Sequence, residues 1–439
     1  MTFSLKKLFQ DFGNIIFTVL FCLIFIECYI QYLNFYFDYS GFTLFPRPLL
    51  FKVLTLTLAV VPILFYRGFR QISSFLSVFI YLILYIPTII TFGYGSELDL
   101  SEVFFVQFIF LLMMIMLMLA DRMVLGNLPM IKIRANLFSI VYGLTVFGAL
   151  YMAFKYRSNL RFVSFTAEVY ELRSENLELG QDFFTRYFSM WLSGVLIPIC
   201  LAYGLVAKRW VYFLTGTAAC VIFYMATASK GIVLFPVIFV IIYFLFSKNR
   251  LNKIYSYLVL SLTVVLWFLL LVTTLDSVWF IVSSLVMSRT IGNGGMLTMW
   301  YYDFFQTHPW TYYSHINLFN AFTHSYPYGD LILGQVVGKE YWADDMNANA
   351  NFWATDGIAA MGLYGVAISS FVLFLIFVIL NTFTRNYNKM FIALVFIPFI
   401  FSLLNTSLFS TLWSGGGFFL ILFFSFRNTR EEVFRAQTT

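Results

Sequence analysis

The sequence predicts an all-α polytopic membrane protein of about twelve transmembrane helices, with cytoplasmic N and C termini and two large outer loops. Two features of its composition carry this prediction. Of the 439 residues, 61% are hydrophobic and only 11% are charged, against roughly 25% charged residues in a soluble domain. So few charges cannot supply the polar surface that a soluble protein of this size needs. A third feature, the alternation of basic residues between successive loops, predicts the orientation.

The apolar stretches account for the predicted helices in order. A helix that crosses the bilayer needs about 20 mostly apolar residues to cover roughly 30 Å of hydrocarbon. Twelve stretches qualify or nearly do: 14–34, 49–65, 74–93, 102–120, 136–154, 187–206, 210–228, 231–247, 254–275, 358–380, 389–404 and 411–426. We therefore expect a single integral membrane domain over 1–439, with a tight turn where the seventh and eighth stretches meet.

Basic residues mark one side of the membrane. Most of the 27 Lys and Arg residues lie in segments that share a side with the N-terminus, such as Lys6, Arg67, Arg122 and Arg385. The short loops on the other side hold almost none. Because short cytoplasmic loops are enriched in Lys and Arg, we expect both termini in the cytoplasm.

Two long outer loops, 155–186 and 276–357, depart from the apolar pattern. The first is dense in charge, and the second is rich in Trp, Tyr, Asn, Gly and His. Loops of this length are uncommon unless they are functional or disordered. The second composition is poor for disorder, so we expect ordered outer segments with short amphipathic helices. The four cysteines lie in apolar runs, and we interpret them as small buried side chains. Their pattern implies neither disulfides nor a metal site.

Charged residues inside or beside the spans are functional candidates, because they are costly in lipid. Glu27 lies deep in the first span, and we prefer a structural role as a hydrogen-bonded acid to a functional one. Lys230, in the turn TASKG, fits a functional cation or a snorkelling structural one equally well. Lys52 and Arg186 lie at span ends, where snorkelling is the simpler interpretation.

Arg289 opens the sequence MSRTIGNGG in the second outer loop. Gly292, Gly294 and Gly295 would allow a ligand to approach the backbone closely. A guanidinium beside backbone N–H groups suits a diphosphate. The rival interpretation is that Arg289 anchors the loop to lipid headgroups.

The three histidines all fall in the second loop, at 308, 315 and 324. Their spacing matches no zinc signature and no cysteine is near, so we expect no metal. His324 is a candidate general base, although a lone histidine is more often a simple hydrogen-bonding residue.

The most unusual stretch is DDMNANANFWATDG, which ends at Gly357. Asp345, Asn347, Asn349 and Asp356 imitate calcium ligands, but Ala350 occupies a position where a calcium loop requires glycine. Alternating amides beside an aromatic ring suit a sugar instead, since amides pair with hydroxyls and rings cover apolar sugar faces. A compatible structural interpretation is an Asn-capped entry into the next span, with Asp356 as a helix cap.

The run DMNANANFWATDGIAAMGLYGV resembles the O-antigen polymerase (Wzy-type) family of oligosaccharide repeat unit polymerases. The turn Ser229-Lys230-Gly231 before an apolar span, and Ser288-Arg289 at the start of the large loop, are also similar to that family. So are the span count, the two large periplasmic loops and the cytoplasmic termini.

This resemblance implies a metal-independent glycosyltransferase of lipopolysaccharide or related polysaccharide biosynthesis, in the bacterial inner membrane. The family moves a growing glycan en bloc from undecaprenyl diphosphate to a new lipid-linked repeat unit. We expect no cofactor, a periplasmic active site, lipid-linked oligosaccharides as substrates, and a chain-length regulator as a further partner.

The departing diphosphate needs cations, and the acceptor hydroxyl needs a base. The catalytic candidates have charged or titratable side chains: Arg289 and Lys230 as cations, with Asp345, Asp356 and His324 as alternative bases. The substrate-binding candidates have cationic, amide or aromatic side chains on the outer loops: Arg173, Tyr326, Asn347, Asn349, Asn351 and Trp353.

Two other functions fit the same architecture. An O-antigen ligase differs in its acceptor, and loop sequence separates it poorly from a polymerase. A transporter of lipid-linked glycans would place its site near the middle of the membrane on broken helices, whereas the polar candidates here lie mainly outside.

Overall fold

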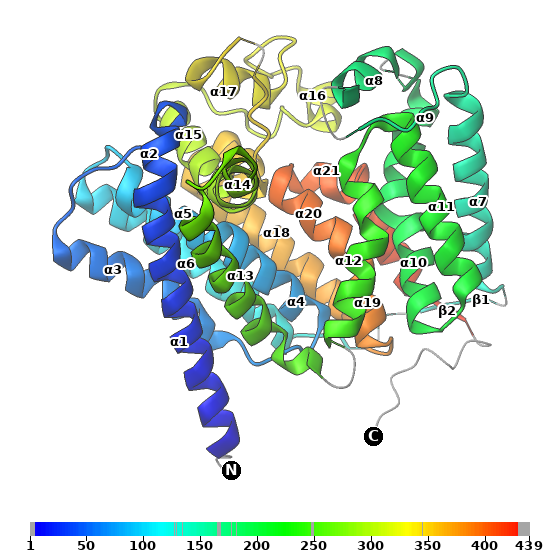
Figure 1. Cartoon of the computed structure of the whole chain (residues 1–439), viewed down its shortest axis with the longest axis horizontal. Coiled ribbons are helices and arrows are strands. Elements are labelled where there is room, and N and C mark those ends of the chain that lie inside the picture. The colour runs from blue at the N-terminus through cyan, green and yellow to red at the C-terminus, as the bar shows by residue number, and fades with distance from the viewer. Residues whose placement is uncertain are drawn as a thin grey trace. The chain divides into compact units, whose positions relative to one another are not determined.

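The computed structural model describes residues 5–126, 128, 130–133, 135–164, 168–176, 178–180, 182–246, 250–344 and 346–428. These residues are almost entirely helical (Figure 1). Besides helices, these residues form two short parallel strands, β1 (Ile131–Ile133) and β2 (Phe426–Asn428), in which Ile131 pairs with Phe426.

The chain divides into two compact units, although we expected a single domain. Unit 1 comprises Met1–Val124, Asn252–Val378 and Leu403–Phe409, and unit 2 comprises Leu125–Leu251, Ile379–Ser402 and Ser410–Thr439. Each unit is therefore built from segments that are distant in sequence.

Unit 1 contains most of the second outer loop. Its principal elements are α1 (Leu5–Cys28), η1 (Tyr29–Asn34), α2 (Phe35–Phe37), α3 (Leu49–Val60), η3 (Val61–Phe65), α4 (Ile72–Phe79), η4 (Ile80–Tyr85), α5 (Ile86–Gly95), α6 (Leu100–Leu119), α13 (Ile254–Val272), α14 (Ser277–Ser283), η9 (Ser284–Gly292), α15 (Asn293–Thr307), α16 (Asn317–Thr323), α17 (Leu333–Tyr341), η10 (Trp353–Ala359) and most of α18 (Ala360–Thr384).

Unit 2 contains the first outer loop. Its principal elements are α7 (Leu137–Lys155), α8 (Glu168–Asn176), α9 (Phe183–Trp191), η7 (Leu192–Leu196), α10 (Ile197–Val206), α11 (Trp210–Thr227), α12 (Lys230–Phe246), α19 (Lys389–Val395), most of α20 (Ile397–Asn405), most of α21 (Leu408–Trp413) and α22 (Gly417–Ser425).

The predicted class, an all-α polytopic membrane protein, is confirmed. Among the described residues, eight helical segments are long and apolar enough to cross a membrane: Phe12–Ser40, Ile72–Gly95, Leu100–Arg122, Leu137–Lys155, Phe183–Val206, Trp210–Thr227, Ile254–Val272 and Trp353–Thr384. Three further apolar helices are shorter: Leu49–Phe65, Lys230–Phe246 and Lys389–Asn405. The last predicted span is divided between α21 and α22. Twelve crossings therefore stay a prediction.

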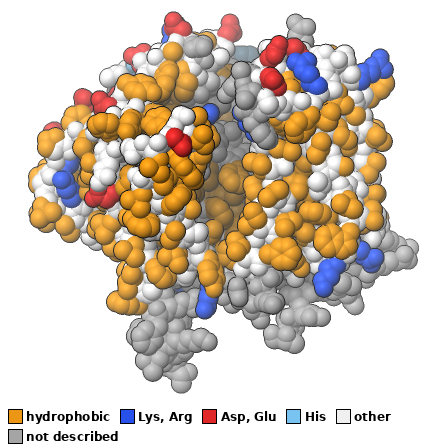
Figure 2. Space-filling model, viewed as in Figure 1, with side chains coloured by type: hydrophobic (Ala, Val, Ile, Leu, Met, Phe, Trp, Pro, Cys, Tyr) orange, Lys and Arg blue, Asp and Glu red, His pale blue; other side chains and the backbone are white. Residues whose placement is uncertain are grey.

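The surface suits a lipid solvent. Figure 2 shows hydrophobic side chains over most of the surface that faces the viewer. All four cysteines are buried and free, as expected from their apolar surroundings.

The second outer loop is more deeply integrated than we expected. Helices α16 and α17 are short, as predicted, but α14, η9 and α15 form one unbroken helical run over 277–307. Most of α15 is buried, where it packs against α5 and η10. Its apolar positions, which include Leu297, Trp300 and Phe304, face the interior of unit 1.

Candidate functional site

The candidate site lies in unit 1, where the helix that begins at η10 is broken. Met361 and Gly362 leave helical geometry, and Gly362 has a φ of +60°, which favours glycine. A break frees backbone carbonyls, which are costly in lipid unless another group donates to them.

The segment 309–316 satisfies these freed carbonyls. The Thr311 N–H donates to the Ala359 carbonyl at 2.8 Å, and the Tyr312 N–H donates to the Ala360 carbonyl at 3.0 Å. The Thr311 hydroxyl donates to the Ala359 carbonyl as well, at 3.0 Å. A segment of the second outer loop therefore completes the backbone hydrogen bonding of a membrane helix.

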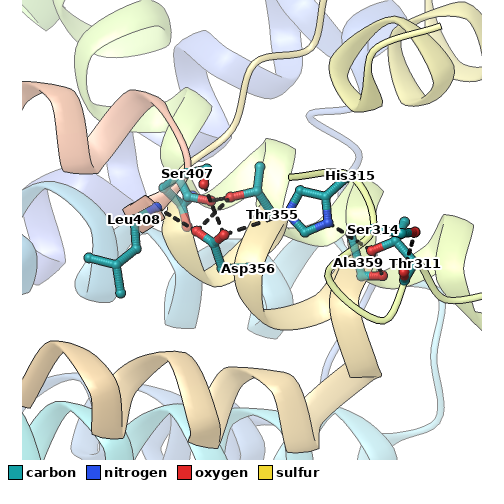
Figure 3. A network of polar contacts seen from close by, with 9 residues as sticks. Thr311, Ser314, His315, Thr355, Asp356, Ala359, Ser407 and Leu408 are labelled. Carbon is teal, nitrogen blue, oxygen red and sulfur yellow. Dashed lines mark hydrogen bonds and ion pairs between the residues drawn. The ribbon is translucent and has the colours of Figure 1, made fainter. Parts of the chain in front are cut away.

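Asp356 lies at the centre of this site and is fully buried (Figure 3). One carboxylate oxygen, Oδ1, accepts from the Ser407 hydroxyl at 2.9 Å, and the other, Oδ2, accepts from the Leu408 N–H at 2.5 Å. The Thr355 hydroxyl lies 3.5 Å from Oδ2. Because a buried carboxylate needs such donors, these contacts explain how the interior holds it.

Asp356 is thus a helix cap, though for a different helix from the one expected. It receives the N–H of Leu408, the first residue of α21. The entry to η10 is capped instead by Asn351, whose Oδ1 accepts from the N–H groups of Trp353 and Ala354 at 3.0 and 3.2 Å. The predicted Asn-capped entry is therefore confirmed.

His315 faces Asp356 from the covering segment. Its Nε2 lies 3.5 Å from Oδ1 of Asp356, and its Nδ1 lies 2.8 Å from the Thr311 hydroxyl. The side chains of both members of this pair are at least nine-tenths buried. Nε2 has no hydrogen-bond partner among the described residues, so it can accept or donate one further hydrogen bond.

The Tyr313 hydroxyl is a second polar atom there that is buried without a partner among the described residues. Burial, and then the negative charge of Asp356, raises the pKa of Tyr313 to about 12. Tyr313 and Tyr312 both have positive φ, at +65° and +46°. Residues other than glycine rarely adopt this backbone conformation, and the exceptions cluster at functional sites.

In unit 2, Arg173 contacts the turn between α11 and α12, and Lys230 follows that turn. Arg173, on α8 of the first outer loop, donates from Nη2 to the Ala228 carbonyl at 3.0 Å. Lys230 begins α12 two residues later. Asn176 also donates to the last turn of α11, at the Ala226 carbonyl, 2.9 Å away. The tight turn predicted from the sequence is therefore covered by the first outer loop.

Arg289 lies in unit 1, on the π-helical segment η9, and its side chain is exposed. The glycines that follow it do not form a ligand cradle, which corrects the prediction. A Cβ at Gly295 would meet the Pro87 carbonyl oxygen at 2.6 Å, and one at Gly294 would meet the Ile83 carbonyl oxygen at 3.2 Å. These glycines allow α15 to pack closely against η4 and α5.

Two predicted sugar contacts are wrong, because their side chains are used inside unit 1. Trp353 is fully buried, and its indole N–H donates to the Ser370 hydroxyl at 2.8 Å. The Asn351 amide donates to the Thr298 hydroxyl at 2.9 Å and is 1% exposed. Neither side chain presents a free face to a glycan.

Asn347 and Asn349, two of the predicted sugar-binding residues, are exposed. They lie side by side over Gly334, where an added Cβ would meet their Oδ1 atoms at 2.2 and 3.1 Å. The intervening Ala348 faces inward and its N–H donates to the Gly334 carbonyl at 2.8 Å. Both residues are exposed on a segment anchored on α17, although their amide oxygens lie against Gly334.

The remaining candidates in the second loop do not join the buried network. His324 ends α16 with a positive φ, is exposed, and receives no hydrogen bond on its ring from the described residues. Tyr326 donates its hydroxyl to the Leu331 carbonyl at 2.9 Å, and burial raises its pKa to about 12. Asp345 lies outside the described residues.

The described residues contain no group of three His, Cys, Asp or Glu side chains that could hold a metal ion. His315 and Ser407 are the members of the site that sequence reasoning missed. The polar run Asn405-Thr406-Ser407 between two apolar stretches is a signal that could have identified Ser407. No spacing in the sequence connects His315 to Asp356.

The fold and the site define a polytopic helical membrane protein with a buried carboxylate–histidine network at a helix break. No family model, curated protein or solved structure matches the chain.

Proposed function

We propose that the chain polymerises undecaprenyl-diphosphate-linked oligosaccharide repeat units, as a glycosyltransferase of the bacterial inner membrane. The proposal rests on the resemblance of the Asn-rich run, the SKG turn and the SR pair to O-antigen polymerases. In this reaction the bond between the anomeric carbon and the diphosphate oxygen breaks. The diphosphate leaves with the electron pair, and an acceptor hydroxyl of the new repeat unit forms the glycosidic bond as it loses its proton.

The observation that carries the proposal is that Arg173 contacts the turn that Lys230 directly follows. Arg173 contacts Ala228 of the α11–α12 turn, and Lys230 is the first residue of α12. Two cations from segments distant in sequence suit the dispersed negative charge of a leaving diphosphate. In unit 1, Arg289 is exposed on η9 and is a separate candidate cation.

The proton of the acceptor hydroxyl needs a destination. We assign it to the His315–Asp356 pair in preference to His324, because a neutral imidazole held beside a carboxylate is an effective base. His315 Nε2 lacks a hydrogen-bond partner among the described residues. Asn347 and Asn349, both exposed on the same face, are the amides available to bind sugar hydroxyls.

Disruption of the gene tests the reaction. The mutant is expected to carry surface glycans with a single repeat unit, seen as loss of the ladder on a gel. In a complemented strain, Lys230→Ala and Arg173→Ala should each lower polymer by about 100-fold, the usual effect of losing one transition-state contact. Lys339→Ala is the control, because Lys339 is 58% exposed and pairs with Asp344. Normal ladders in both variants, at equal protein levels, would refute the diphosphate role.

A transporter of lipid-linked glycans is the second candidate, favoured by the break in α18. Transporters bind substrates at discontinuous helices inside the membrane, and the break at Met361 and Gly362 lies close in sequence to buried Asp356. The same gene disruption separates the two functions. Loss of a transporter leaves no repeat unit on the surface, whereas loss of a polymerase leaves single units.

A further inference from the structure

Helix α1 carries a carboxylate on a side that the rest of unit 1 leaves open. Glu27 lies well inside the membrane segment Phe12–Ser40, and its side chain is exposed. It accepts a hydrogen bond from the Gln31 amide, one turn further on, at 2.7 Å. The hydrogen-bonded acid expected from the sequence is present, but its exposed position was not predicted.

These two polar residues belong to a continuous stripe on α1 and η1. Exposed residues recur every three or four positions, the spacing that places side chains on one face of a helix. The stripe consists of Phe12, Ile16, Leu20, Leu23, Glu27 and Gln31. The opposite face, with Cys22, Phe25 and Tyr29, is fully buried and packs mainly against α13.

A carboxyl group that faces hydrocarbon is unfavourable, and charged residues in membrane helices almost always face protein or a water-filled cavity. None of the described residues forms an ion pair with Glu27. The negative charge of Glu27 acts on Tyr94, whose ring centre lies 6.0 Å from the Lys52 ammonium. One Glu27 oxygen and one Gln31 N–H therefore have no hydrogen-bond partner among the described residues.

We propose that this stripe binds the same stripe of a second copy, so that the protein forms a two-fold dimer through α1. Two copies in one membrane have the same orientation, so their α1 helices are parallel and residues near 27 in one copy face residues near 27 in the other. The free N–H of each Gln31 can then donate to the free oxygen of the other copy's Glu27. Polar side chains of this kind hold membrane helices together, and the flanking leucines complete an apolar contact surface.

Cysteine cross-linking in native membranes tests the dimer, because the four natural cysteines are buried. Leu23→Cys places a thiol on the stripe, and Leu112→Cys on α6 is the matched control. The two leucines are similarly exposed, at 45% and 41%, and both lie in membrane segments. Oxidation should convert Leu23→Cys to a covalent dimer at least tenfold more completely than Leu112→Cys.

Glu27 variants in the Leu23→Cys background test the polar contact. Glu27→Leu should lower the cross-linked fraction at least tenfold, and Glu27→Gln should retain most of it, because an amide still pairs across the two-fold axis. The proposal is overturned if Leu23→Cys cross-links no better than Leu112→Cys. It is also overturned if Glu27→Leu leaves the dimer intact, or if the adduct contains a different protein.

Discussion

Two carboxylates show how surroundings decide what the same group does in this protein. Asp356 is fully buried and is held by the Ser407 hydroxyl and the Leu408 N–H. Asp182 is exposed at the start of α9, where it accepts from the Thr185 N–H and pairs with Lys155, each at 2.9 Å. Both carboxylates cap a helix, but the first does so from the interior of unit 1 and the second from the surface.

The Asp182 cap predicts a dependence of stability on pH. The Thr185 N–H and then Lys155 hold the pKa of Asp182 well below its usual 3.8, so the folded protein binds its proton less readily than the unfolded chain. The stabilisation is present above pH 3.8 and is lost as the pH falls below it. The melting temperature of wild type should therefore exceed that of Asp182→Asn at pH 5, with the gap closing at lower pH. A gap that is constant with pH would contradict this account.

At the scale of the element, two tyrosine hydroxyls donate hydrogen bonds to backbone carbonyls where a proline interrupts a helix. Pro62 has no N–H, so the Leu58 carbonyl loses its donor at the junction of α3 and η3. The Tyr85 hydroxyl donates to this carbonyl at 2.8 Å, and the Tyr81 hydroxyl donates to the Ala59 carbonyl at 2.8 Å. Because both tyrosines lie on η4, one turn of one helix satisfies the end of another.

Removal of the Tyr85 hydroxyl tests how much this hydrogen bond contributes to the stability of the protein. Tyr85→Phe leaves the Leu58 carbonyl buried without a donor, a loss that costs about 1–3 kcal/mol. We expect a lower melting temperature for the purified protein in detergent. Tyr364→Phe, whose ring is 75% exposed on α18, is the control and should melt like wild type. Equal melting of the two variants would show that the Leu58 carbonyl finds another donor.

At the scale of the whole molecule, each unit gathers segments that are distant in sequence. Unit 1 joins the first 124 residues to 252–378, and the intervening residues belong to unit 2. Neither unit is therefore a contiguous stretch that could be cut out of the chain. The three short apolar helices, Leu49–Phe65, Lys230–Phe246 and Lys389–Asn405, and the divided span of α21 and α22 decide how many times the chain crosses.

Reporter fusions test those three crossings. An enzyme that is active only outside the cytoplasm should be active when fused after Arg47, Ser229 or Thr406, the outer ends predicted for the three helices. It should be inactive after Arg70, Arg250 or Tyr387, at the inner ends. Equal activity on both sides of any one helix would remove that crossing from the count of twelve.

The class of fold was predictable because composition and apolar length are properties of contiguous sequence. The buried positions of Cys22 and Cys200, and the cap at Asn351, depend on neighbours along the same helix and were predictable for the same reason. The buried position of α15 was not predictable, because its apolar face packs on α5, which is distant in sequence.

The candidate site was predictable only in part. Asp356 and the exposed Asn347 and Asn349 follow from local pattern. The role of Trp353 was predicted wrongly, because the local sequence is the same whether an aromatic ring beside amides binds a sugar or packs among helices. His315 was missed because its partner comes from a separate segment, and only the folded chain brings the two together.

The covered break in α18 joins a segment of the second predicted outer loop to an apolar helix. The carbonyls of Ala359 and Ala360 are satisfied by the N–H groups of Thr311 and Tyr312. If segment 309–316 moved away alone, it would leave these carbonyls to lipid and separate His315 from Asp356. The hydrogen bonding of the helix at its break therefore depends on the position of this loop segment.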